Sequence, residues 1–458
     1  MQFMRRSAIA RWPISTLPMP TVISGLVMLG LAPAVAWALA TENWRILAFL
    51  GAVALLPVLA TWPVVSTFGI YALCTSSIDL FPFLPGGATV TKLVGVLAGG
   101  TLLIAGLIER RLVYPPRAAV WWGAFMVWAA LSTAWALDVD LAKELFPRVL
   151  NFFLLYLVTV SFRPTPKEVF GICALTVLGG VLASVLAYTM GFNPDAVTLR
   201  ASRAKLTFGD MTSNPNALGR ILLLPLALAV AGLVDLRGTL KRAVVTVCIV
   251  LIGIGIYLSM SRGAIVAMST MFLMLVYRLR RRRYIVAALI LLLAVSTAMP
   301  ASFFQRIGSV TAGEDSTGSG RTAIWSIGMR AVPDFAFVGA GFNNFDMVYR
   351  QYSVEYTART SGQGAHNTYL AVSLELGLIG LVLMLGAVGA HLLAARHARA
   401  AGHVSVTLIA TEAACVGMLT SAFFGDVLAT KPFWLTWTIL AWAISSGQSA
   451  AHSEPSQQ

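Results

Sequence analysis

Apolar runs of about 20 residues recur from one end of this chain to the other. A helical run of that length crosses the hydrocarbon core of a bilayer, because an α-helix rises about 1.5 Å per residue. The runs lack the alternation of apolar and polar residues that is typical of the strands of a membrane β-barrel. The sequence therefore predicts an all-α polytopic membrane protein.

The composition supports this prediction and limits the partners. Of the 458 residues, 58% are hydrophobic and 11% are charged, whereas soluble domains carry about 25% charged residues. The net charge of +14 would suggest nucleic acid as a partner in a soluble protein. Here the basic residues collect in short loops between apolar runs, as the positive-inside rule expects. We therefore expect membrane lipids around the chain and no nucleic-acid partner.

Hydropathy predicts about 12 transmembrane helices, within a range of about 12–14. The candidate spans lie near 20–40, 46–62, 64–83, 88–108, 118–137, 146–162, 168–190, 216–234, 243–260, 263–278, 284–299, 368–395, 404–425 and 432–446. Lysine and arginine gather in every second connection, and the block Arg280–Arg283 is the densest of these. Those connections are expected in the cytoplasm, together with both termini.

The chain divides into four regions, one of which is a long polar connection. These are N-terminal transmembrane helices with short loops at 1–299, a large extracytoplasmic loop at 300–367, C-terminal transmembrane helices at 368–446, and a cytoplasmic tail at 447–458. A loop of this length is usually functional. Within it, an amphipathic stretch carries Ile324, Trp325 and Ile327, which we expect to lie on a membrane surface.

A histidine marks the point where the large loop enters the next span. His366 is the one histidine expected on the extracytoplasmic side. An unperturbed imidazole has a pKa of about 6.5 and is suited to act as a general base. The alternative is an ordinary polar residue that caps a helix.

Three arginines are expected at the extracytoplasmic ends of spans, against the positive-inside bias. They are Arg203, Arg220 and Arg262, and Arg220 lies one helical turn after Asn216. A guanidinium group binds phosphate oxygens bidentately, so several around one cavity would suit a diphosphate. The alternative is that these side chains snorkel to the membrane surface or form structural ion pairs.

Two competing interpretations come from the acidic residues. Asp138 and Asp140 form a D-x-D pattern that can hold Mg²⁺ or Mn²⁺ through oxygen ligands, although a solvated turn is the simpler reading. A transporter or flippase needs a polar path through the bilayer, and charged residues are sparse in the spans, with Glu412 as the main exception.

Four patches occur in an order that resembles a known family. They are Arg203…Phe208-Gly209…Asn214-Pro215-Asn216; Ser261-Arg262-Gly263-Ala264; Arg321-Thr322-Ala323-Ile324-Trp325 with Val338-Gly339-Ala340-Gly341-Phe342-Asn343-Asn344-Phe345; and His366-Asn367-Thr368-Tyr369-Leu370 with Glu375-Leu376-Gly377. Together they resemble the O-antigen ligase and polymerase superfamily of bacterial envelope glycosyltransferases.

This resemblance implies a GT-C-type fold in the bacterial inner membrane, with 300–367 as a periplasmic loop and the active site on the periplasmic face. It implies a glycan donor on undecaprenyl diphosphate, a lipid A–core or growing-glycan acceptor, inversion at the anomeric carbon, and neither cofactor nor metal. By resemblance, His366 would be the general base, and Arg203 and Arg262 would bind the diphosphate. The residues expected to bind substrate are Asn216, Arg220, Arg321, Asn367 and Tyr369.

The same motifs leave the acceptor open. The single compact loop and the form of the His366 patch favour an O-antigen ligase. A polymerase of O-antigen or exopolysaccharide is the main alternative, because both reactions release the same leaving group. A protein O-oligosaccharyltransferase and a non-catalytic polysaccharide transporter are the remaining possibilities.

Overall fold

A computed structural model describes residues 61–77, 89–192, 203–208, 211–279, 321–353 and 364–452. The predicted spans near 20–40 and 284–299, nearly all of the one near 46–62, and the Arg280–Arg283 block lie outside these residues. Within them the chain is built from helices, with one short hairpin of two-residue strands, β1 (Thr207–Phe208) and β2 (Met211–Thr212).

The first half of the described chain forms long helices joined by short turns. They are α4 (Pro63–Ser77), α5 (Val90–Ile108), α6 (Arg117–Leu131) with the 3-10 turn η1 (Ser132–Ala134), α7 (Val139–Val160), α8 (Pro166–Gly191), α9 (Pro215–Ile221), α10 (Leu223–Asp235), α11 (Thr239–Leu258) and α12 (Arg262–Leu279).

The second half alternates short and long helices. They are α15 (Arg321–Ala331) with η2 (Val332–Phe335), α16 (Phe345–Ser353), α17 (Thr368–Glu375), α18 (Gly377–Ala400), α19 (Val406–Ser421) with η3 (Ala422–Phe424), and α20 (Lys431–His452).

Seven apolar segments in the described part of the chain are long enough to cross a bilayer. Large apolar side chains point outward along them, including Val96 at 75% exposure and Leu240 at 78%. A water-soluble protein rarely exposes so much apolar surface, whereas a lipid-facing helix does. The described structure is that of a polytopic all-α membrane protein, as predicted.

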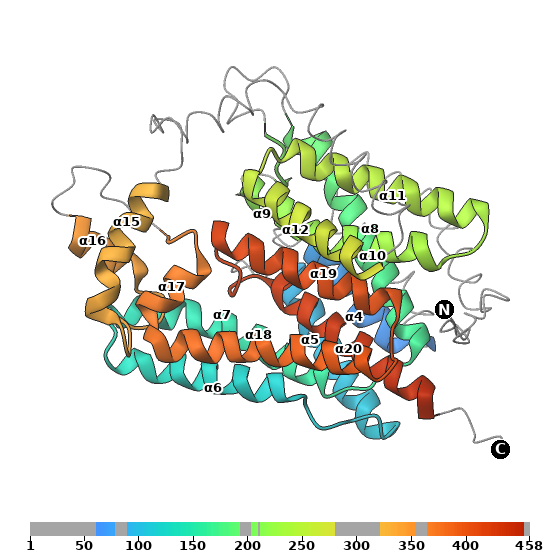
Figure 1. The fold of residues 1–458 in the computed structure, drawn as a ribbon, viewed down its shortest axis with the longest axis horizontal. Coiled ribbons are helices and arrows are strands. Elements are labelled where there is room, and N and C mark those ends of the chain that lie inside the picture. The colour runs from blue at the N-terminus through green and yellow to red at the C-terminus, as the bar shows by residue number, and fades with distance from the viewer. Residues whose placement is uncertain are drawn as a thin grey trace, which may run out of the picture.

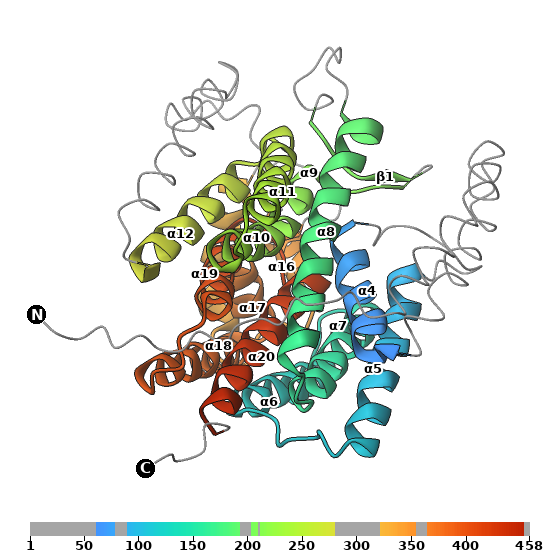
Figure 2. The same ribbon diagram turned by 90° about the vertical axis from the view of Figure 1, so that its right-hand side faces the viewer.

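The bundle has two apolar cores. One joins α4, α8, α10, α12 and α19. The other joins α6, α7, α18 and α20 around buried tryptophans, with the rings of Trp122 and Trp434 at 5.0 Å between centroids. Figure 1 shows α6 running beside α18, and Figure 2 shows α8 and α4 together on another side of the bundle.

The span predicted near 368–395 is two helices rather than one. The chain breaks between α17 and α18 at Gly377, whose φ of +65° is a left-handed conformation that favours glycine. A Cβ atom there would lie 2.1 Å from the carbonyl oxygen of Phe337. The break therefore lets the large loop pack directly against the start of α18.

Helices α15, α16 and α17 gather at one end of the bundle, on the left in Figure 1. Their shared core buries Ile324 and Ile327, each 3% exposed. The prediction that these two side chains lie on a membrane surface is therefore wrong, because α16 and α17 cover the apolar face of α15. Trp325 is also turned inward, since its Nε1 donates to the carbonyl of Ala365 at 3.0 Å.

A buried ion triad lies near the opposite end of the bundle. Glu412 in α19 is 2% exposed. Its carboxylate accepts hydrogen bonds from Arg278 at the end of α12, at 3.1 Å, and from Arg399 in α18. The mid-membrane charge noticed in the sequence is thus paired inside the protein, as buried charges must be.

Candidate active site

His366 lies immediately before α17, at the inner edge of the large-loop helices. Its backbone has a φ of +48°, which is unusual for a residue with a side chain and is typical of functional sites. Hydrogen bonds hold both residues adjacent to His366 in place. Ala365 accepts the Trp325 bond, and Asn367 caps α17 by accepting from the N–H groups of Tyr369 at 3.0 Å and Leu370 at 3.2 Å. The imidazole is therefore held by a rigid segment.

Three helices bring cationic side chains to this region. Arg262 and Arg321 are the first residues of α12 and α15, and Arg220 is in α9. Helix α9 begins where it does because Asn214 caps it and Pro215 fits its first position. Chain segments far apart in the sequence therefore place their arginines at one end of the bundle.

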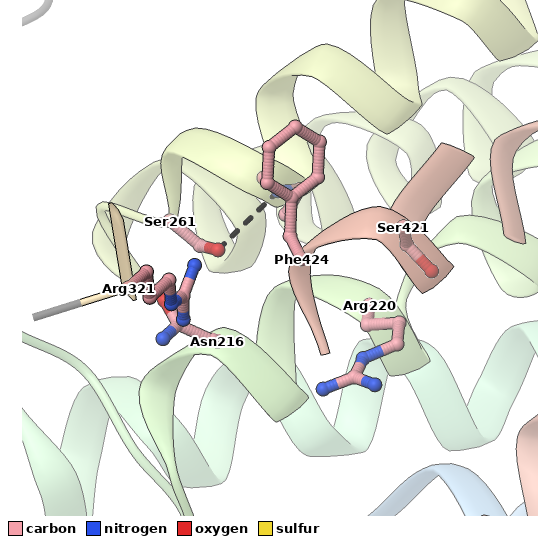
Figure 3. Close-up of a pocket in the computed structure, with 8 residues that line it drawn as sticks. Asn216, Arg220, Ser261, Arg321, Ser421 and Phe424 are labelled. Atoms are coloured by element: carbon pink, nitrogen blue, oxygen red, sulfur yellow. Dashed lines mark hydrogen bonds between the residues drawn. The ribbon is translucent and has the colours of Figure 1, made fainter. Parts of the chain in front are cut away.

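A small pocket opens among these helices. Its lining residues are Asn216, Arg220, Ser261, Gly263, Ala264, Arg321, Ser421 and Phe424. Figure 3 shows the guanidinium groups of Arg220 and Arg321 with Phe424 between them in this view. A Cβ atom on Gly263 would lie 2.7 Å from that of Phe424, so the glycine beside Arg262 lets η3 approach α12 closely.

The charges of these side chains act on His366. Its pKa is lowered from the ordinary value of 6.5, first by burial and then by the positive charges of Arg321 and Arg220. The pKa of Arg321 is lowered in turn by burial and by the charge of Arg262. The four groups thus form one electrostatically coupled cluster, in which the imidazole is neutral at neutral pH.

Arg321 has hydrogen-bonding capacity to spare. Its buried Nε has no hydrogen-bond partner within the described part of the chain. A buried donor without a partner costs free energy of about 1–3 kcal/mol, and an anion in the pocket would recover it. Clustered guanidinium groups repel one another, so the arrangement suits a ligand with several negative charges.

The Arg203 side chain forms hydrogen bonds within the protein. Its Nε donates to the carbonyl of Ser259 at 2.9 Å, and its Nη2 donates to Oδ1 of Asn216 at 2.6 Å. Ser259 precedes Arg262 by three residues, and Asn216 lines the pocket. Arg203 therefore connects the beginnings of α9 and α12.

The remaining predicted residues are also engaged in contacts within the protein. The Oδ1 of Asn367 is the helix cap described above. The hydroxyl of Tyr369 donates to the carbonyl of Leu419 at 2.9 Å, and its ring lies 4.4 Å from that of Phe423. Asn367 thus stabilises the beginning of α17, and Tyr369 packs α17 against the end of α19 and η3.

Sequence reasoning missed Asp426, which follows η3. Its backbone carbonyl accepts a hydrogen bond from Nη1 of Arg220 at 2.5 Å. The sequence feature that could have identified Asp426 is its position as an acidic residue in a short apolar turn between two predicted spans.

The D-x-D pattern has a structural role. Asp138 caps α7, with Oδ1 accepting from the N–H groups of Asp140 at 2.9 Å and Leu141 at 3.2 Å. The Asp140 side chain is 95% exposed. Among the described residues, no group of three or more histidine, cysteine, aspartate or glutamate side chains could hold a metal ion.

Fold and site together define a multi-pass helical membrane protein with a cationic pocket at one end of its bundle. Two arginines that line this pocket, Arg220 and Arg321, act electrostatically on His366. Residues 247–385 match the family model described as O-antigen ligase, and this segment includes Arg262, Arg321 and His366. The expected resemblance to the O-antigen ligase and polymerase superfamily is therefore confirmed.

A curated relative points in the same direction. The chain is 35% identical over 77 residues to the "Exopolysaccharide production protein ExoQ" of Rhizobium meliloti (strain 1021). The matched stretch covers 16% of this chain and 18% of the relative.

Proposed function

We propose that this protein is a glycosyltransferase of the bacterial inner membrane that transfers a glycan from undecaprenyl diphosphate to a hydroxyl acceptor on the periplasmic face. The observation that carries this proposal is that half-buried His366 is electrostatically coupled to Arg321 and Arg220, which both line one pocket. A neutral base next to clustered guanidinium groups suits a reaction that removes a proton and expels a diphosphate. Both chain termini would lie in the cytoplasm.

The arginines would bind the leaving group. Arg220, Arg262 and Arg321 would surround the diphosphate, and the buried Nε of Arg321 would donate to one of its oxygens. Arg203 would act by holding Asn216 and the Ser259 turn in place. Preorganised cations can supply several kcal/mol of transition-state stabilisation in a site that excludes water.

His366 would activate the acceptor. The imidazole takes the proton of the acceptor hydroxyl as its oxygen attacks the anomeric carbon of the donor. The new carbon–oxygen bond forms while the bond to the diphosphate breaks, and undecaprenyl diphosphate leaves as an anion. Attack opposite the leaving group inverts the anomeric configuration. A well-placed base contributes about 10²–10⁴-fold to such a step.

For the acceptor, we propose a sugar of lipid A–core, which makes the protein an O-antigen ligase. The match to the O-antigen ligase family model supports this choice. A second candidate is a polymerase that extends an exopolysaccharide, and the name of the ExoQ relative favours it.

Gene deletion complemented with His366→Ala tests the proposal. The variant should insert normally and fail to restore glycan transfer, as judged by electrophoresis of lipopolysaccharide and analysis of exopolysaccharide. Full-length lipid-linked glycan that accumulates beside rough lipopolysaccharide identifies a ligase, and single repeat units identify a polymerase. Restored transfer by His366→Ala would show that His366 is not the general base, and it would favour the transporter alternative.

A further inference from the structure

The hydroxyl of Thr368 joins two parts of the site that are distant in the sequence. Thr368 is the first residue of α17 and is 1% exposed. Its Oγ1 donates to the carbonyl of Gly425 at 2.8 Å and accepts from the N–H of Val427 at 3.1 Å. One side chain thus binds both ends of the three-residue segment centred on Asp426.

The Arg220 side chain contacts the backbone of that segment. Nη1 of Arg220 donates to the Asp426 carbonyl at 2.5 Å. A Cβ atom built on Gly425 would lie 2.8 Å from Nη2 and 3.0 Å from Nη1, so the guanidinium rests directly on this glycine. A displacement of the 425–427 backbone would therefore displace the guanidinium with it.

Thr368 is also held close to His366, the proposed base. It follows His366 by two residues, and the Asn367 cap holds the beginning of α17 rigid. One buried hydroxyl thus links the residue two positions after His366 to the backbone segment that contacts the Arg220 guanidinium. That hydroxyl donates and accepts at once, which a methyl group cannot do.

We propose that Thr368 is a positioning residue for glycan transfer, which sets the placement of Arg220 relative to His366. The inference rests on the proposed function, because it assigns Thr368 to the same site without contact to substrate. Errors of about 1 Å in such placement can cost about 100-fold in rate.

The test compares variants in isolated membranes of a deletion strain, which supply the strain's own lipid-linked glycan and acceptor. Initial transfer rates are normalised to inserted protein. Thr368→Ser keeps the hydroxyl and should retain at least about a third of the wild-type rate, whereas Thr368→Val should lose about 10- to 100-fold. Thr176→Val is the matched control, because buried Thr176 bonds only to the carbonyl of Ile172 in its own helix among the described contacts.

A double-mutant cycle separates positioning from general stability. In an Arg220→Ala background, Thr368→Val should cost less than about threefold, because the group it positions is gone. An equal loss in both backgrounds would overturn the proposal, as would a fully active Thr368→Val. Thr368→Ala replaces the valine variant if that fails to insert, and failure of both would make the hydroxyl a folding element, which also overturns the proposal.

His366→Ala is measured in the same membranes. If it retains transfer, the proposed function fails. If it is inactive while Thr368→Val is fully active, only the positioning role fails.

Discussion

Arg220 and Asp426 are 206 residues apart in the chain and are joined by a hydrogen bond from the guanidinium to the backbone carbonyl. The contact connects α9 to the turn between η3 and α20. The acceptor is the backbone carbonyl of Asp426, so the Asp426 carboxylate takes no part in this hydrogen bond. A main-chain group therefore holds Arg220, one of the residues that line the pocket.

Gly425→Ala should impair transfer without unfolding the protein. The new methyl group would occupy the place of the Arg220 guanidinium, which can move away because its side chain is flexible. The backbone at Gly425 is extended, so alanine is allowed there. We expect about a tenfold or larger loss of rate, because the guanidinium moves from its place. Gly389→Ala in α18, where a Cβ atom meets nothing within 4 Å, is the control and should stay active.

Arg321→Gln should move the acid limb of the pH–rate profile to higher pH. Burial and the charges of Arg321 and Arg220 lower the His366 pKa below 6.5, so the wild-type rate should fall only in more acidic solution. Loss of one positive charge makes protonation easier and raises that pKa. The profile is measured between about pH 4.5 and 8. Arg330→Gln, exposed near the other end of α15, serves as the control. A limb that stays in place or moves to lower pH would contradict the electrostatic coupling.

Arg203→Lys should lower both stability and transfer. Lysine cannot reach the Ser259 carbonyl and the Asn216 oxygen with the fork geometry of a guanidinium. Hydrogen bonds to charged donors contribute about 1.5–3 kcal/mol, and we expect a loss of that order in the free energy of unfolding. Thermal unfolding in detergent measures it. An unchanged midpoint with lost transfer would instead favour direct contact between Arg203 and the diphosphate.

Asp138→Ala should destabilise the protein and leave its chemistry unchanged. Removal of a helix cap costs about 0.5–2 kcal/mol, whereas Asp140→Ala alters an exposed side chain and should be nearly neutral. Transfer should persist in EDTA. Activity that disappears in EDTA and returns with Mn²⁺ would assign a metal role to these carboxylates.

Hydropathy predicted a span at each of the seven described segments that are long and apolar enough to cross a bilayer. The predicted span at 168–190 is α8 at Pro166–Gly191, which a proline and a capping box delimit at its start. The interruption at Gly377 was not predicted, because a tertiary contact with Phe337 causes it rather than any change in hydropathy. The inward packing of Ile324 likewise depends on α16 and α17, which are distant in the sequence.

The candidate site was predicted in part. His366, Arg220 and Arg262 stood out because charged groups at the extracytoplasmic ends of spans need a reason to be there. The tie between Arg203 and Asn216 was not predictable, because both partners are polar residues with many possible contacts. Asp426 and Thr368 were missed as site residues because their roles depend on backbone contacts across more than 50 residues.

The shared carboxylate of Glu412 has a consequence for biogenesis. An ionised side chain within a lone spanning helix costs free energy on insertion. Arg278 and Arg399 both precede Glu412 in the chain, so a ribosome synthesises the two cations before the anion that they neutralise. The two arginines that pair with the Glu412 carboxylate are therefore already synthesised when α19 emerges from the ribosome.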